Sequence, residues 1–525
     1  MVVNVNMEVK FFNKNRTCKN FSRIQSHMKK ILMMLLILSS RMLTMAQDEG
    51  ENIFLDRSFW QNNPSVDSVK QKISQGHDPT EQDLFGFDAV SYGIIDDAPF
   101  ETLKFLLSIE GNPVTKPTHG DLTYLLWAAY KGNIPMVKHL IELGSDVQFK
   151  TARGTNILLM SGFGGQQDTL LYDLMFSQGV DPNSSSSSQM NILLALAGSD
   201  ADKEDIFKYL IKKGLDWNQQ DENGNGFFHY AAKAGNQANM NLAIRRNLEF
   251  NSLNKKGENA MFYATYGRRR SEVLLETFMF LDSLGLEADI VNWKGQTPLH
   301  HAVKRGNAEV IDFFIEKGVN INQVDVDGNT AFMNAVFGKL ENVQKLLPLV
   351  KNPNQINHKG YSALTNAVIY ARKDAFDLLV EQGSELTIHD KNENDLISLI
   401  FQNFSERRKE DFEYILNELI ANEISVKPIY ADGNSLYHYA IEKNSPLLIQ
   451  KAIELNVDPN HKNNLGLTPL HLAAMKATNG EIIEMLINAG ADKNILTDFE
   501  ESPHELATQN EILKSNKIDI SSLQR

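Results

Sequence analysis

The chain has 525 residues, of which 42% are hydrophobic and 22% charged; this is the composition of a folded globular protein rather than a disordered, collagenous or polytopic membrane protein. Its formal net charge of −14 disfavours DNA binding driven by overall charge, since affinity for phosphates needs a clustered basic excess. The single cysteine, Cys18, excludes an internal disulfide framework and a multi-thiolate zinc site.

Residues 1–46 form a leader of distinct composition. They contain eight Lys and Arg residues and one acidic residue, so the rest of the chain carries a net charge of about −21. The apolar run 31–38 follows Met28-Lys29-Lys30 and is too short to span a bilayer, but it has the length typical of a secretory signal peptide. We predict a signal-peptide-like segment at 28–46, with translation starting at Met28 rather than Met1. The alternative is a retained amphipathic or buried N-terminal helix.

A fixed period organises the rest of the chain. Comparable registers recur at Gly86, Gly120, Gly154, Gln189, Gly224, Gly257, Gly295, Gly328, Gly360, Glu393, Gly433, Gly466 and Glu500. A period near 33 residues, held over more than 400 residues, predicts a solenoid of stacked units rather than separate globular domains. Within each unit the apolar pattern predicts a short helix, a Gly-containing turn, a longer amphipathic helix and an Asp/Asn-rich loop.

Two segments carry the most specific pattern, Gly295-Gln296-Thr297-Pro298-Leu299-His300 and Gly466-Leu467-Thr468-Pro469-Leu470-His471. On these residues the chain resembles the ankyrin-repeat family over about residues 86–510. The resemblance implies an all-α solenoid of about 13–14 helix-turn-helix units with projecting hairpin loops. Thr297 and Thr468 would cap the first helices, Pro298 and Pro469 would occupy their first turns, and Leu299 and Leu470 would be buried between units.

These patterns divide the chain into four parts. They are the leader 1–46, a divergent N-terminal capping unit at 47–85, the repeats at 86–499, and a degraded C-terminal cap with its tail at 500–525. Gln189, Glu393 and Glu500 stand where the pattern has Gly.

The sequence offers no recognisable catalytic set. It contains no phosphate-binding Gly-rich loop, no His-Glu-x-x-His motif and no Gly-x-Ser-x-Gly motif. His229, His300, His438 and His471 recur at one repeat position, where the family resemblance implies a hydrogen-bonding role at the helix start. We therefore expect no enzyme activity, no cofactor and no metal site.

Two units are longer than the others, with 38 residues from Gly257 and 40 residues from Glu393, and the extra residues fall between the two predicted helices. Both insertions are basic: Arg268, Arg269 and Arg270 in the first, Arg407, Arg408 and Lys409 in the second. They would act as basic prongs that engage an acidic partner, or they are solvated helix extensions.

The family resemblance also implies a binding surface. In ankyrin-like stacks, residues that flank the turn Gly and residues that end the first helix line the concave recognition face. Here they are Lys255, Lys256, Tyr266, Trp293, Lys294, Lys304, Arg305, Phe337, Lys359, Tyr361 and Tyr370. Aromatic and basic residues on an acidic chain suit an interface hot spot. Alternatively, Tyr266 and Phe337 pack between units, and Asp327 and Glu258 in the same stripe oppose the positive charge.

Together these observations predict a non-enzymatic scaffold that binds another protein and is exported to the periplasm or the extracellular space. The alternative is a cytosolic or membrane-tethered adaptor with a retained N-terminus. Binding of nucleic acid or another polyanion rests only on the two basic insertions, and the charge of about −21 opposes it.

Overall fold

The computed structural model describes residues 52–200, 204–268, 274–306 and 308–524. The leader 1–46 with its signal-peptide-like segment lies outside the described residues, as do Arg269 and Arg270 of the first basic insertion. Over the described ranges all regular elements are helices, and one isolated β-bridge joins Val324 to Thr330. The predicted all-α solenoid is confirmed.

The chain divides into two compact units, of which the first ends at Thr151 and the second begins at Ala152. In the first unit, the helix pairs are α2 (Arg57–Gln61) with α3 (Val66–Ser74), α4 (Ala89–Ile95) with α5 (Phe100–Leu107), and α6 (Tyr124–Lys131) with α7 (Ile134–Glu142).

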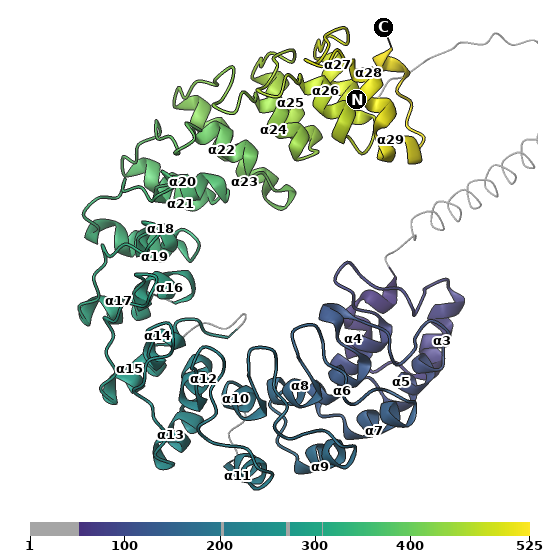
Figure 1. The fold of residues 1–525 in the computed structure, drawn as a ribbon, viewed down its shortest axis with the longest axis vertical. Coiled ribbons are helices and arrows are strands. Elements are labelled where there is room, and N and C mark those ends of the chain that lie inside the picture. Colours follow the sequence, from purple (N-terminus) through teal and green to yellow (C-terminus); the bar gives the residue numbers. More distant parts are fainter. Residues whose placement is uncertain (1–51, 201–203, 269–273, 307, 525) are drawn as a thin grey trace, which may run out of the picture. The chain divides into compact units, whose positions relative to one another are not determined.

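The second unit continues the same alternation of first and second helices. Its pairs are α8 (Ile157–Phe163) with α9 (Thr169–Ser177), α10 (Ile192–Ala197) with α11 (Glu204–Lys212), α12 (Phe227–Ala234) with α13 (Gln237–Arg245), α14 (Ala260–Ala264) with α15 (Leu275–Ser283), α16 (Pro298–Arg305) with α17 (Ala308–Glu316), α18 (Ala331–Ala335) with α19 (Leu340–Leu346), α20 (Ala363–Ile369) with α21 (Lys373–Glu381), α22 (Leu396–Gln402) with α23 (Lys409–Ala421), α24 (Leu436–Glu442) with α25 (Pro446–Glu454), α26 (Pro469–Lys476) with α27 (Glu481–Asn488), and α28 (Pro503–Gln509) with α29 (Glu511–Ser515). Figure 1 shows α10, α12, α14 and α16 in one row and α11, α13, α15 and α17 in a second row beside it.

The residue that leads into each first helix has a left-handed backbone. All thirteen register positions read from the sequence have φ between +61° and +84°. Glycine adopts this conformation without steric cost, whereas another residue loses about 1 to 2 kcal/mol. Gln189, Glu393 and Glu500 hold the same conformation, with φ of +62°, +61° and +64°, so the register continues through the units that lack Gly.

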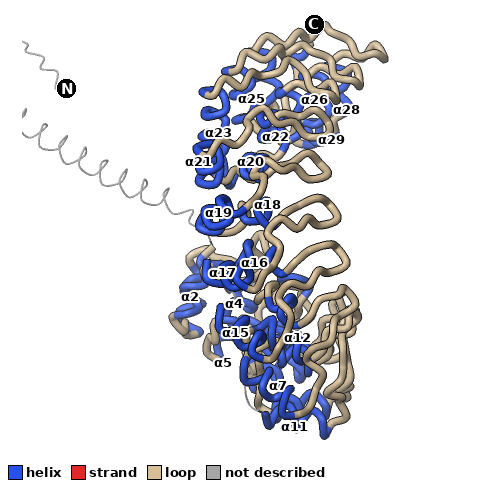
Figure 2. The backbone as a smooth tube through the Cα atoms, turned by 90° about the vertical axis from the view of Figure 1, so that its left-hand side faces the viewer, coloured by secondary structure: helices blue, strands red, loops and turns tan. Residues whose placement is uncertain are grey.

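Successive loops of the second unit are linked through their backbones. The N–H of Trp293 donates to the carbonyl of Lys256 (2.9 Å), and the N–H of Val326 donates to the carbonyl of Lys294 (2.8 Å). Equivalent bonds link the other successive loops, from the N–H of Ser187 with the carbonyl of Arg153 to the N–H of Lys391 with the carbonyl of Lys359. Figure 2 shows these loops projecting from one side of the helices around α16 to α22. The loops therefore form an ordered row rather than independent tips.

The first helices begin with side-chain caps that also contact the next unit. At α16 the backbone N–H of Thr297 donates to Nδ1 of His300 (3.1 Å), which leaves the proton on Nε2 to donate to the carbonyl of Asn329 (3.2 Å). His438 repeats this arrangement with the backbone N–H of Ser435 (3.1 Å) and the carbonyl of Leu467 (3.0 Å). The expected hydrogen-bonding role is therefore present at both histidines.

The other two repeat histidines differ in detail. His471 accepts from the backbone N–H of Thr468 (3.2 Å), as its sequence motif predicts. His229 follows Gly226, and α12 has no side-chain cap because glycine has none to offer. Leu299 and Leu470 are fully buried, as expected for residues between units.

Both basic insertions lie between the two helices of a unit, as predicted. The first connects α14 to α15, and the second connects α22 to α23 through a 3₁₀ turn at Glu406–Arg408. Helix α23 has 13 residues, so part of the second insertion lengthens the helix at its start. Arg407, Arg408 and Lys409 are all exposed.

Candidate protein-binding surface

The ends of the first helices form a stripe of aromatic and basic side chains in the second unit, here called the first-helix stripe. It consists of Lys233, Tyr266, Lys304 and Phe337, together with Tyr370, which lies beside Phe337. Each of the first four is the seventh residue after the N-cap residue of its helix. Nζ of Lys304 lies 5.7 Å from the centre of the Phe337 ring. The edge of Phe337 meets Tyr370 at 4.8 Å between ring centres. The structure thus brings together three of the predicted residues from three consecutive units.

Tyr266 occupies the stripe in a more enclosed setting. Its hydroxyl donates to the buried carboxylate of Glu258 (2.6 Å), and its ring meets His301 edge-on at 4.7 Å. Burial raises the pKa of the Tyr266 phenol, so the side chain stays neutral and keeps its proton for this bond. Tyr266 is half-buried, whereas Tyr370 is 52% exposed and offers more area to a partner.

The loop tips carry the second group of predicted residues. Trp293 is 65% exposed, and Nζ of Lys294 lies 5.7 Å from its ring centre. Lys255 donates from Nζ to the carbonyl of Glu222 in the preceding loop (2.8 Å). Lys359 is exposed, and Lys256 and Tyr361 are half-buried. These residues lie on the linked row of loops rather than on the first-helix stripe.

A row of exposed aliphatic residues on the same loops was not predicted from the sequence. Each residue directly precedes the Asn or Asp that begins a loop tip, and the row comprises Leu253, Val291, Val324 and Ile356, with exposures of 59%, 49%, 38% and 51%. Their shared register was a usable signal, because aliphatic residues at one loop position of four consecutive units are not required by the core. Exposed apolar side chains that recur at one loop position add area for a protein partner.

Three arginines, two of them in the insertions, contact preceding units. Arg408 donates from Nη1 to the carbonyls of Tyr370 (3.1 Å) and Ala371 (3.2 Å). Arg305 donates from Nη1 to the carbonyl of Tyr266 (2.7 Å), and Arg268 forms an ion pair with Asp200. These guanidinium groups therefore hold the ends of first helices in place, so Arg268 and Arg408 are not free prongs.

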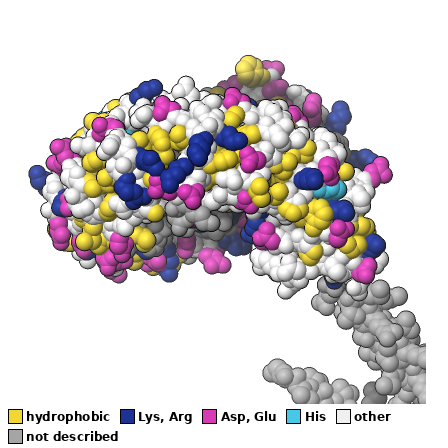
Figure 3. Space-filling view, turned by 90° about the horizontal axis from the view of Figure 1, so that it is seen from below, with side chains coloured by type: hydrophobic (Ala, Val, Ile, Leu, Met, Phe, Trp, Pro, Cys, Tyr) yellow, Lys and Arg dark blue, Asp and Glu magenta, His cyan; other side chains and the backbone are white. Residues whose placement is uncertain are grey.

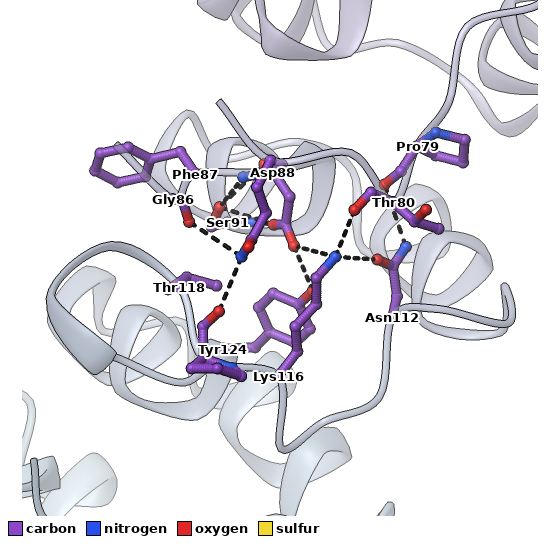
Figure 4. Close-up of polar contacts among 12 residues, drawn as sticks. Pro79, Thr80, Gly86, Phe87, Asp88, Ser91, Asn112, Lys116, Thr118 and Tyr124 are labelled. Atoms are coloured by element: carbon purple, nitrogen blue, oxygen red, sulfur yellow. Dashed lines mark hydrogen bonds and ion pairs between the residues drawn. The ribbon is translucent and has the colours of Figure 1, made fainter. Parts of the chain in front are cut away.

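The first unit contains a buried cluster of polar groups centred on an ion pair. Nζ of Lys116 lies 2.9 Å from Oδ2 of Asp88 and donates to the carbonyl of Thr80 (2.7 Å) and to Oδ1 of Asn112 (3.1 Å). The hydroxyl of Tyr124 donates to the same Asp88 oxygen (2.6 Å). Figure 4 shows the Lys116 ammonium directed at these acceptors. Because each group has partners from other segments, the cluster joins the chain internally rather than offering a reactive group.

Within the described ranges, no cluster of three or more His, Cys, Asp or Glu residues could hold a metal ion. Among the helices of those same ranges, none has the length and apolar content needed to cross a bilayer. Figure 3 shows a face where basic, acidic and hydrophobic side chains are interspersed.

Comparison with known proteins supports the repeat assignment. A family model described as ankyrin repeats, in three copies, matches residues 192–277, 274–357 and 407–497. An ankyrin repeat protein of Acanthamoeba polyphaga mimivirus is 24% identical over 330 residues, which are 55% of this chain and 40% of that protein. An ankyrin repeat protein of fowlpox virus is 28% identical over 171 residues, which are 33% of this chain and 87% of that protein.

An enzyme also matches. The phosphocholine transferase AnkX of Legionella pneumophila is 24% identical over 234 residues, which are 40% of this chain and 24% of the transferase. The chain thus spans less than half the length of both the mimivirus protein and the transferase.

Proposed function

The chain is an ankyrin-repeat protein, and from that premise we propose that it is a scaffold that binds another protein through the first-helix stripe and the loop tips of its central units. One observation carries this proposal. Nζ of Lys304 lies beside the Phe337 ring, Nη1 of Arg305 donates to the carbonyl of Tyr266, and among the described residues neither cation forms a salt bridge. On a body with a net charge of about −21, such unmatched positive charge favours an acidic partner.

The scaffold would act by holding its side chains in place before the partner arrives. Tyr266 is fixed by Glu258, Arg305 by the carbonyl of Tyr266, and the loop tips by the backbone bonds between units. A surface ordered in advance loses little conformational entropy on association, so more of the contact energy appears as affinity. The exposed Trp293 and Tyr370 are of the residue type that anchors interfaces.

The proposal is tested by capturing partners with the full chain from the cells that express it, followed by mass spectrometry. The capture is repeated with a variant that carries Trp293→Ala, Lys304→Ala and Tyr370→Ala. A control carries Lys212→Ala on the second-helix side of α11. A true partner is recovered with the wild type and the control and is lost with the triple variant. Equal recovery in all three samples would remove this surface from consideration.

We further propose that the chain is exported. The apolar run after Met28 supports export because it has the length of a secretory signal segment, and the absence of cysteine after residue 46 suits an oxidising compartment. The alternative is a cytosolic or membrane-tethered adaptor. N-terminal sequencing of the protein from its own cells distinguishes them. A start at Gln47 supports export, and retention of residues 28–46 supports the adaptor.

We also propose that the chain acts without catalysis. The likeness to the phosphocholine transferase covers 24% of that enzyme and does not by itself indicate catalysis by this chain, because one repeat architecture carries many unrelated functions. Incubation of the purified chain with a candidate partner and with a phosphocholine donor tests this directly, and any covalent mass increase of the partner would contradict it.

A further inference from the structure

A groove of about 260 Å³ opens on the first-helix side of the second unit, between α8 and the residues Gly267 and Arg268 that follow α14. Phe163, Met190 and Leu194 supply an apolar wall, and Phe163 is 42% exposed although its neighbours on α8 are buried. Lys233 and Arg268 supply positive charge at the same groove. An apolar surface with a few polar groups is the usual character of a binding groove.

The two cations of the groove differ in their partners. Arg268 pairs with Asp200, with Nη2 3.1 Å from Oδ2. Lys233 is half-buried, and its Nζ lies 5.3 Å from the centre of the Tyr263 ring. No carboxylate among the described residues lies within salt-bridge distance of Lys233. The groove therefore contains a partly desolvated ammonium group that forms no salt bridge among the described residues, although the carboxylate of Asp221 acts on it at longer range.

The surroundings of Lys233 disfavour the charged form of its side chain. Burial and, after it, the nearby Arg305 lower the pKa of the Lys233 ammonium. Tyr230, which lines the groove with Lys233, is fixed in position, because its hydroxyl donates to the buried carboxylate of Asp221 (2.9 Å). An incoming carboxylate would relieve the repulsion between Lys233 and Arg305 without any rearrangement of the wall.

We propose that this groove binds a segment of the partner protein in which an acidic residue stands beside a bulky apolar residue. The apolar side chain packs on Phe163, Met190 and Leu194, and the carboxylate pairs with Lys233. The inference rests on the proposed scaffold function and names the chemistry of its partner. An acidic peptide fits better than a nucleic acid, because the wall is apolar and the chain outside the leader carries about −21.

The groove is tested with a phage library of random 12-residue peptides selected on the full chain. We expect enrichment of peptides in which Asp or Glu lies next to Phe, Leu, Met or Trp. The most enriched peptide is then synthesised with a fluorophore, and its affinity is measured by fluorescence polarisation. Lys233→Met, which keeps the stem and removes the charge, should weaken binding about tenfold or more. Phe163→Ala should do the same, and Lys233→Arg should retain most of the affinity.

Lys212→Met is the matched control, since Lys212 is exposed at the end of α11 on the second-helix side. It should bind the peptide as the wild type does. Circular dichroism of every variant checks that a loss of binding is not a loss of fold.

Three outcomes would overturn the inference. Selected peptides could lack acidic residues, or a 12-residue thymidine oligonucleotide could bind more tightly than the peptide and compete with it. Alternatively, peptides could bind equally to Lys233→Met and Phe163→Ala but lose affinity with Trp293→Ala and Lys304→Ala. In this last case the scaffold function stands and the groove does not. A chain that captures no protein and enriches no peptide would contradict both.

Discussion

The hydroxyl of Tyr266 donates a 2.6 Å hydrogen bond to Oε1 of Glu258, whose side chain is only 1% exposed. The same carboxylate accepts from Nδ2 of Asn254 in its own loop (2.9 Å) and from Nδ2 of Asn292 in the next loop (3.0 Å). One buried acidic group thus connects the end of a first helix with two consecutive loops. Its three donors are all neutral side-chain groups.

Replacing this carboxylate by an amide should destabilise the central units. Glu258→Gln turns one acceptor oxygen into an NH₂ donor that faces the donor of Asn254 or Asn292. A buried donor left without an acceptor costs about 1 to 3 kcal/mol. We expect a lower urea midpoint by circular dichroism, and a smaller loss for Tyr266→Phe. An unchanged midpoint for Glu258→Gln would show that the network adds nothing to stability.

The left-handed residues that are not Gly offer a route to a more stable chain. Gln189, Glu393 and Glu500 have φ near +60°, where a side chain is unfavourable, so changing each to Gly should raise stability by about 0.5 to 1 kcal/mol. Gly360→Ala should act in the opposite direction, because its Cβ would lie 2.8 Å from Cα of Asp390. Thermal melts of the triple Gly variant and of Gly360→Ala give the comparison. A triple variant that melts below the wild type would contradict this reading of the loops.

The stability of the second unit should fall in mild acid. Burial lowers the pKa values of His300 and His438, and it lowers that of His301 to about 4. The unfolded chain takes up these protons near the ordinary pKa of about 6.5, whereas the folded chain takes them up only at lower pH. Stability is therefore fully present above about pH 6.5 and declines as the pH falls towards the folded pKa values.

Urea unfolding at pH 7.5, 6.0 and 5.0 measures this dependence. The free energy of unfolding should decrease along the series. A variant with His300→Asn and His438→Asn keeps an acceptor near Thr297 and Ser435 but has fewer titrating groups, so its decrease should be shallower. Identical slopes for the variant and the wild type would assign the acid sensitivity to other groups.

The buried ion pair of the first unit provides a local test of how far a defect spreads. Lys116→Met leaves the fully buried Asp88 without its cation and should cost about 3 to 5 kcal/mol, whereas the double variant with Asp88→Asn should lose less. Because units of a solenoid contact mainly their neighbours, hydrogen exchange by mass spectrometry should accelerate in α4 to α6 and stay unchanged in α20 to α22. Faster exchange throughout the chain would indicate a single cooperative structure.

Periodic features were predictable from sequence, whereas pairings between distant side chains were not. The Gly register located the turns even at Gln189 and Glu393, because the spacing of helices and loops follows from local patterns that repeat. The paired Arg268 and Asp200 are 68 residues apart, and nothing in either local sequence indicates the other. Lys233 occupies the same register as Lys304 and Phe337, so the repeat pattern by itself assigns it to the first-helix stripe.

The row of backbone bonds between successive loops has a mechanical consequence. Between every two neighbouring loops from Arg153 to Lys391, one amide–carbonyl bond joins a hairpin tip to the tip before it. A pulling force applied to the two ends of this row would load those bonds in series. Extension in an optical trap should therefore proceed in steps of about 33 residues, with one unit released at a time.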